Sequence, residues 1–84
     1  MISIVRDLAA EALFVSDLQP SQCPSHEAVE SAVTTMILQY GSDGCAASVA
    51  LEFGDHPDTA VARMHWVHTE LTEVLEPHRA PVLH

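Results

Sequence analysis

Histidines and cysteines are the side chains of this sequence that offer the most direct chemistry. His65 and His68 are three residues apart, so on a helix they would project from one face and could share a metal ion. A third ligand would have to come from His56, Asp55 or the end of the chain, and no HExxH, CxxC or Glu-x-x-His pattern supplies one. Histidines on an ordinary polar surface explain the pair more simply. We therefore predict no metal site and no cofactor.

Motifs for nucleophilic or carrier chemistry are also missing. Cys45 is expected near the start of a helix, where the helix dipole could lower a thiol pKa, but the alanines beside it indicate ordinary packing. Cys23 and Cys45 are expected to remain free thiols. An acyl carrier needs a serine that opens a helix in the order Asp-Ser-Leu, whereas this chain has Ser16-Asp17-Leu18 and Ser42-Asp43. We predict that the protein is not an enzyme.

Charge narrows the range of partners. Among 84 residues there are twelve acids and three basic residues, all arginines, which gives a net charge of −9. Such a surface repels nucleic acids and anionic membranes and favours a protein partner with a basic surface. No apolar run approaches the ~18 residues that span a bilayer, and the first residues lack the features of a signal peptide. We expect a cytoplasmic protein.

Apolar residues recur at helical spacing in four segments, which predicts an all-α, four-helix domain. Ser25 is a good N-cap for the second helix. Gly41 and Gly54 are expected to end the second and third helices, because glycine adopts left-handed backbone angles without steric cost. The helices are predicted over about residues 2–16, 26–40, 44–53 and 57–76, within one domain (1–76) that a flexible tail (77–84) follows.

The predicted helices bury different amounts of their surface. The first is apolar nearly all round, which indicates more than one neighbour and favours self-association as a homodimer. Its core stripe is predicted from Ile4, Leu8, Ala12 and Val15, and Val5, Ala9 and Leu13 widen it. The last helix has one inward stripe with the spacing of a short heptad seam, formed by Ala60, Met64, Val67, Leu71 and Val74. Three apolar residues fall off the predicted stripes and are expected to anchor a protein interface: Phe14, Leu38 and Trp66.

Residues 49–65 have the order of a helix-turn-helix, with a short helix, a glycine and a second helix. Ala50, four residues before Gly54, would let the two helices approach closely. The segment resembles the promoter-binding region of bacterial sigma factors, in which a threonine, an arginine and an aliphatic residue follow the turn glycine. Gly54, Thr59, Arg63 and Met64 match these positions. The resemblance implies a helix-turn-helix-like corner between helices 3 and 4, with Thr59, Arg63 and His65 toward DNA.

The charge of this corner departs from that family. Asp55 stands where an aliphatic residue normally follows the glycine, and Asp58 lies where a phosphate would dock at the helix N-terminus. We therefore predict a small acidic protein–protein interaction or regulatory module that self-associates. The alternative is a transcription regulator that binds DNA as a dimer through Thr59, Arg63 and His65.

Overall fold

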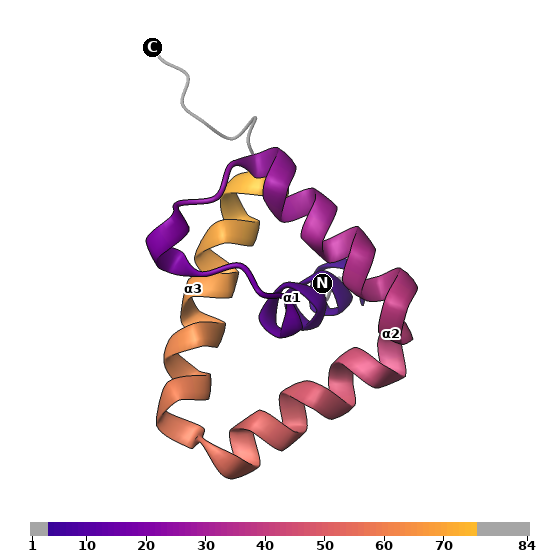
Figure 1. Ribbon diagram of the computed structural model, residues 1–84, viewed down its shortest axis with the longest axis vertical. Coiled ribbons are helices and arrows are strands. Elements are labelled where there is room, and N and C mark those ends of the chain that lie inside the picture. The colour runs from indigo at the N-terminus through magenta and orange to yellow at the C-terminus, as the bar shows by residue number, and fades with distance from the viewer. Residues whose placement is uncertain (1–3, 76–84) are drawn as a thin grey trace.

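The computed structural model describes residues 4–75, which form three α-helices and one short 3-10 helix (Figure 1). α1 spans Ile4–Val15, η1 spans Pro20–Gln22, α2 spans His26–Asp55 and α3 spans Pro57–Leu75. This described part contains no β-strand, as the all-α prediction required. None of its helices is both long and apolar enough to cross a membrane. The tail predicted over 77–84 lies outside the described residues.

The prediction of four helices is wrong, because the second and third predicted helices are the two halves of α2. Gly41 is the point of division, with φ 71° and ψ 172°. Essentially only glycine adopts these backbone angles. The positive φ expected at Gly41 is therefore confirmed, but it produces a kink and no loop, because the residues on both sides are helical.

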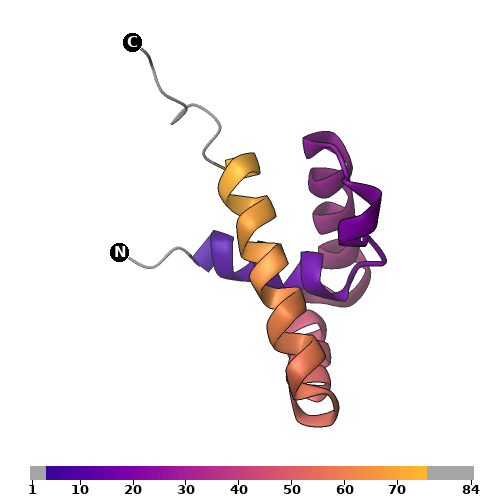
Figure 2. The same cartoon turned by 90° about the vertical axis from the view of Figure 1, so that its left-hand side faces the viewer.

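α1 lies at the centre of the fold. The two halves of α2 and the length of α3 form three sides of a frame, and α1 crosses it, seen end-on in Figure 1 and from the side in Figure 2. α1 contacts both α2 and α3. The neighbours that its apolar surface predicted are thus present within one chain, and this surface gives no separate reason for self-association.

The core forms where α1 and α3 meet the first half of α2. The stripe predicted for α3 is confirmed: Ala60, Val67, Leu71 and Val74 are buried, and Met64 packs at the edge. On α1, Ala9, Ala12 and Leu13 of the predicted stripe are buried, and Ala10 and Phe14, which were placed outside it, are buried as well.

Polar contacts fix the ends of the frame. The Ser25 Oγ accepts a hydrogen bond from the Ala28 backbone N–H at 3.1 Å, which confirms the predicted N-cap of α2. His26 Nε2 lies 3.8 Å from a carboxylate oxygen of Glu73, so the start of α2 is held near the end of α3. Arg6 on α1 donates to the Thr72 hydroxyl at 2.9 Å. These two contacts thus link α3 to the start of α2 and to α1.

The corner between α2 and α3 is short. His56 is the one residue between the two helices, and Pro57 opens α3, as predicted. Gly54 lies in the last turn of α2, and a Cβ built on it would meet nothing within 4 Å. Ala50 is exposed. The close helix contact expected around Ala50 and Gly54 is therefore not formed.

Candidate functional site

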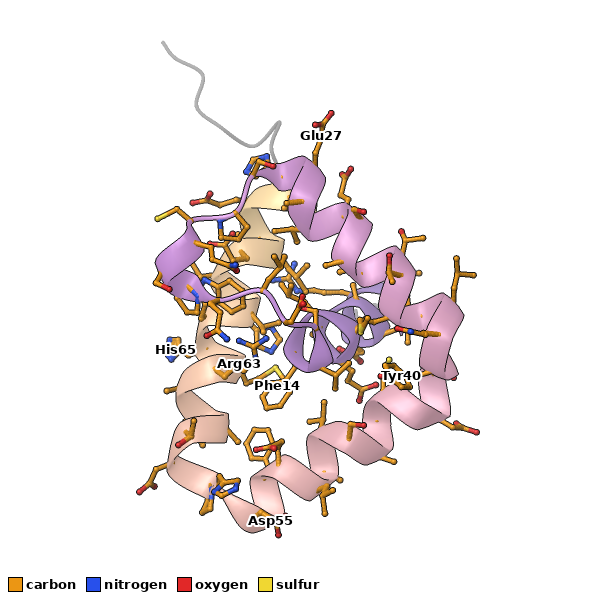
Figure 3. The ribbon with its side chains drawn as sticks, in the orientation of Figure 1. Phe14, Glu27, Tyr40, Asp55, Arg63 and His65 are labelled. Carbon is orange, nitrogen blue, oxygen red and sulfur yellow. The ribbon has the colours of Figure 1, made fainter. Side chains whose placement is uncertain are left out.

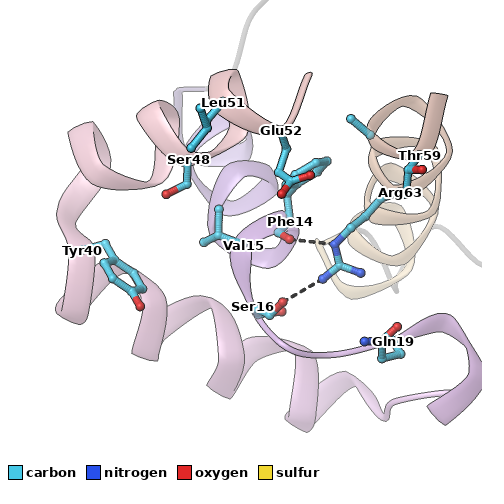
Figure 4. Close-up of a pocket in the computed structure, with 11 residues that line it drawn as sticks. Phe14, Val15, Ser16, Gln19, Tyr40, Ser48, Leu51, Glu52, Thr59 and Arg63 are labelled. Carbon is cyan, nitrogen blue, oxygen red and sulfur yellow. Dashed lines mark hydrogen bonds between the residues drawn. The ribbon is translucent and has the colours of Figure 1, made fainter. Parts of the chain in front are cut away.

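Arg63 closes the C-terminal end of α1. The last carbonyls of a helix have no partner within it, and the last turn of α1 carries no basic residue of its own. Arg63, from α3, supplies the donors: its Nε donates to the Phe14 carbonyl at 2.7 Å, and its Nη2 donates to those of Ser16 and Leu13 at 2.9 and 3.3 Å (Figure 4). This places a positive charge at the negative end of the helix dipole.

The guanidinium of Arg63 also lies against two aromatic rings. Its central carbon lies 5.7 Å from the ring centroid of Phe14 and 5.3 Å from that of Trp66, both within cation–π range. The Phe14 ring in turn stacks on Phe53, with centroids 5.9 Å apart. Burial lowers the pKa of Arg63, but the group stays charged at neutral pH. Arg63 is thus a structural link between α1 and α3.

A cleft of about 540 Å³ opens beside the end of α1, between the second half of α2 and the first half of α3 (Figure 4). Its volume falls in the range of about 300–1,000 Å³ that is usual for binding sites. The buried floor includes Phe14 and Ala60. Tyr40 and Leu51 stand at the rim and remain 55% and 64% exposed. The cleft therefore leaves large apolar side chains in contact with water.

A hollow of about 390 Å³ lies between the end of α1 and the first half of α2. The hollow and the cleft share Val15, Ser16 and Tyr40. We call the two together the Tyr40 groove. Glu52 lines the cleft and Asp17 lines the hollow, and within residues 4–75 neither carboxylate forms an ion pair. Since Arg63 is engaged with α1, the exposed charge of the groove is negative.

The two predicted histidines lie on the outer side of α3. His65 and His68 border a shallow apolar hollow of about 360 Å³ together with Phe53, Val61 and Met64. Across the part of the chain that the structure describes, no three His, Cys, Asp or Glu side chains gather closely enough to hold a metal ion.

The three predicted interface anchors do not form one patch. Phe14 was placed off the core, and this is wrong: its side chain is only 4% exposed, because Phe53 of α2 and Arg63 of α3 lie against its ring. Trp66 is partly buried and covers Arg63. Leu38 is 82% exposed on the first half of α2, and it lines neither part of the Tyr40 groove.

The residues that the sigma-factor resemblance places toward DNA point in different directions. Thr59 is exposed and lines the cleft, whereas His65 lines the hollow on the outer side of α3. Figure 3 shows Arg63 directed toward Phe14 and His65 directed away from the core. The structure does not bring these three side chains onto one surface.

Sequence reasoning missed Tyr40, Leu51 and Glu52 as residues of a site. Tyr40 lies at helical spacing with Val33, Met36 and Ile37, which is the pattern of an apolar helix face, but the kink at the next residue leaves it exposed. Leu51 had a usable signal, because it lies off the apolar stripe that Ala46, Val49, Ala50 and Phe53 form at helical spacing. Glu52 is one acid among twelve, and no pattern in the sequence distinguishes it.

Cys45 is a packing residue. It lies inside α2 and not at a helix N-terminus, and its side chain is fully buried, which confirms the ordinary packing predicted for it. Burial raises the pKa of the thiol, and the negative charge of Glu11 adds to this rise. The Sγ donates to the Met36 carbonyl at 3.8 Å. Both cysteines are free thiols, as predicted, and Cys23 is exposed.

Comparison of the chain with protein-family models, curated proteins and solved structures gives no match. The function of the chain is therefore inferred from its own geometry.

Proposed function

We propose that this protein is a small, acidic, non-enzymatic module that binds another protein in the Tyr40 groove. The observation that carries the proposal is the cleft of about 540 Å³ with Tyr40 and Leu51 at its rim, 55% and 64% exposed. Exposed apolar side chains around a concave surface are typical of protein-binding sites, and tyrosine is enriched among the residues that dominate binding energy.

The groove is supported by rigid elements. Its walls come mostly from the three α-helices, with Ser16, Asp17 and Gln19 from the loop after α1. Arg63 joins the end of α1 to α3 through three hydrogen bonds beside the cleft. A site held in its binding conformation loses little conformational entropy when a partner binds. The same contacts that stabilise the fold therefore favour recognition in the Tyr40 groove.

The position of Arg63 counts against DNA binding through α3. Its donors are occupied by carbonyls of α1, and the chain as a whole carries a net charge of −9. Fluorescence anisotropy of a labelled mixed-sequence duplex at low salt tests this alternative. Binding that weakens with salt would favour the regulator hypothesis, because phosphate contacts depend strongly on salt.

Self-association stays a prediction, and Leu38, one of the three predicted anchors, is the residue that supports it. Leu38 is 82% exposed, and its burial against a second copy would remove a large apolar side chain from water. Sedimentation velocity over a range of concentrations tests this prediction. A dimer that dissociates in Leu38→Ser would support it, and a monomer at the highest concentration would contradict it.

Selection from a displayed library of random peptides tests the proposed module directly. The protein is used as bait, and the Leu51→Ser variant serves for counter-selection. Leu38→Ser is the matched control, since it replaces an exposed leucine of the same helix outside the groove. Enriched peptides that bind the protein and the control but not Leu51→Ser would support the proposal. A library that yields none would contradict it.

A further inference from the structure

We infer that the partner segment is a basic amphipathic helix, which places its apolar face in the Tyr40 groove and its lysines or arginines beside Glu52 and Asp17. The inference rests on the proposed function and specifies the chemistry of the partner. Charge and shape support it independently.

Charge selects a basic partner. Glu52 and Asp17 lie in the two parts of the groove, and within residues 4–75 no cation pairs with either carboxylate. The one arginine that lines the groove, Arg63, directs its donors into α1. Complementary charge at the rim of an interface raises the association rate and excludes partners of like sign.

A second copy of the same chain fits the groove less well. It would bring its own net charge of −9 to a surface that is already negative. Like charges that face each other across an interface oppose association, whereas a cationic segment relieves the repulsion among the acids of the groove. The net charge thus favours a different, basic chain over a homodimer at this site.

Shape selects a helix. The cleft and the hollow, of about 540 and 390 Å³, adjoin at Val15, Ser16 and Tyr40, so the groove offers two neighbouring places for apolar anchors. A helix that binds in a groove presents such anchors at positions i, i+3, i+4 and i+7 of one face. An extended peptide usually pairs with an exposed sheet edge, and the described residues contain no strand.

Individual residues should contribute unequally. Leu51 at the rim is 64% exposed and would be buried by an apolar anchor of the partner, so Leu51→Ser should weaken binding about tenfold or more. Glu52 is exposed and would form a solvent-accessible ion pair. Such pairs contribute little, and we expect Glu52→Gln to weaken binding about twofold to fivefold.

Three fluorescein-labelled peptides of equal length, about 16 residues, test the inference by fluorescence anisotropy with the full chain. The first carries leucine and phenylalanine on one helical face and lysine and arginine on the other. The second keeps the pattern but replaces the basic residues with glutamate. The third has the composition of the first in a scrambled order that abolishes the apolar face. The first should bind most tightly, and raised ionic strength should weaken its binding.

Matched variants locate the site. Leu51→Ser is compared with Leu38→Ser, and Glu52→Gln with Glu30→Gln, which removes an equal charge from an exposed residue outside the groove. We expect only Leu51→Ser and Glu52→Gln to weaken binding of the basic amphipathic peptide.

The outcomes separate the inference from the proposed function. Equal binding of the scrambled basic peptide, unchanged by any variant, would overturn the inference, because only the overall charge would then act. Preferential binding of the acidic amphipathic peptide that is lost in Leu51→Ser would also overturn it but would support the module. If neither amphipathic peptide binds, the inference fails, and the library selection then decides whether the module binds a partner of another chemistry.

Discussion

Replacement of Arg63 by alanine removes three hydrogen bonds from the carbonyl end of α1 and two cation–π contacts. A hydrogen bond to a charged group contributes about 1.5–3 kcal/mol. A cation at a helix C-terminus contributes up to about 2 kcal/mol, and each cation–π contact adds about 0.5–1 kcal/mol. These terms share one guanidinium and are not additive.

The expected loss is therefore well below the sum of the terms. The end of α1 borders the cleft, so water can reach some of the backbone carbonyls that lose the arginine as a donor. We expect Arg63→Ala to lower the free energy of unfolding by about 2–4 kcal/mol. A chain of 84 residues has a total of about 4–13 kcal/mol. The variant should thus melt well below the parent, since each kcal/mol shifts Tm by about 4–8 °C in a domain of this size.

Urea unfolding, followed by far-ultraviolet circular dichroism and by the fluorescence of the single tryptophan, Trp66, measures this loss. Arg63→Lys keeps the charge but not the planar fork, so it should lose about half as much. Arg63→Lys is therefore also the control for net charge, whereas Arg6→Ala would break the bond to Thr72 as well. If Arg63→Ala stays within about 0.5 kcal/mol of the parent, the capping argument is wrong.

Two further predictions concern glycines and a thiol. Gly41→Ala should destabilise the fold by about 1–3 kcal/mol through backbone strain alone, since its Cβ would meet nothing within 4 Å. Gly54→Ala, in an equally open helical position, should stabilise the fold by about 0.5–1 kcal/mol. The midpoints of urea unfolding test both variants. Lower stability of Gly54→Ala would indicate a close helix contact at this glycine. Burial raises the pKa of the Cys45 thiol, so folding favours its protonated form. The stability that the protonated thiol contributes is present below the ordinary thiol pKa of about 8.5, and it is lost as pH rises through the pKa of the folded state. The free energy of unfolding should therefore fall in alkaline solution, and it should fall less steeply in Cys45→Ala. In the folded protein, Ellman's reagent should modify Cys23 rapidly and Cys45 slowly. Equal rates would contradict the burial of Cys45.

Local sequence signals predicted the helices well. The α3 stripe from Ala60 to Val74 and the cap at Ser25 depend on residues a few positions apart, so periodicity and hydrogen-bonding chemistry suffice to find them. The merger of two predicted helices into α2 is a different matter. Gly41 has the positive φ of many helix ends, but its ψ of 172° lies outside the left-handed helical region. Whether the chain turns away at such a glycine or resumes its helix depends on packing against α1.

The site was harder to predict, because contacts distant in sequence determine which side chains remain exposed. Phe14 has the signature of an interface residue on an isolated helix, yet α2 and α3 enclose α1 and bury it. Tyr40 has the signature of a core residue, yet the kink that follows leaves it at the rim of the cleft. Periodicity gives the face of a helix on which a residue lies, but not the neighbour that the face meets.

Arg63 shows how a motif and a structural role can compete for one side chain. The sigma-factor resemblance places this arginine toward phosphate, but its hydrogen-bond partners in the structure lie 47 to 50 residues earlier in the chain. To contact DNA, Arg63 would have to leave the carbonyls of Leu13, Phe14 and Ser16, and a helix end without partners is costly where water is restricted. Phosphate binding by Arg63 would thus act against the packing of α1. A partner that binds in the Tyr40 groove leaves these bonds intact, and this compatibility with the fold is the strongest physical reason to favour protein recognition.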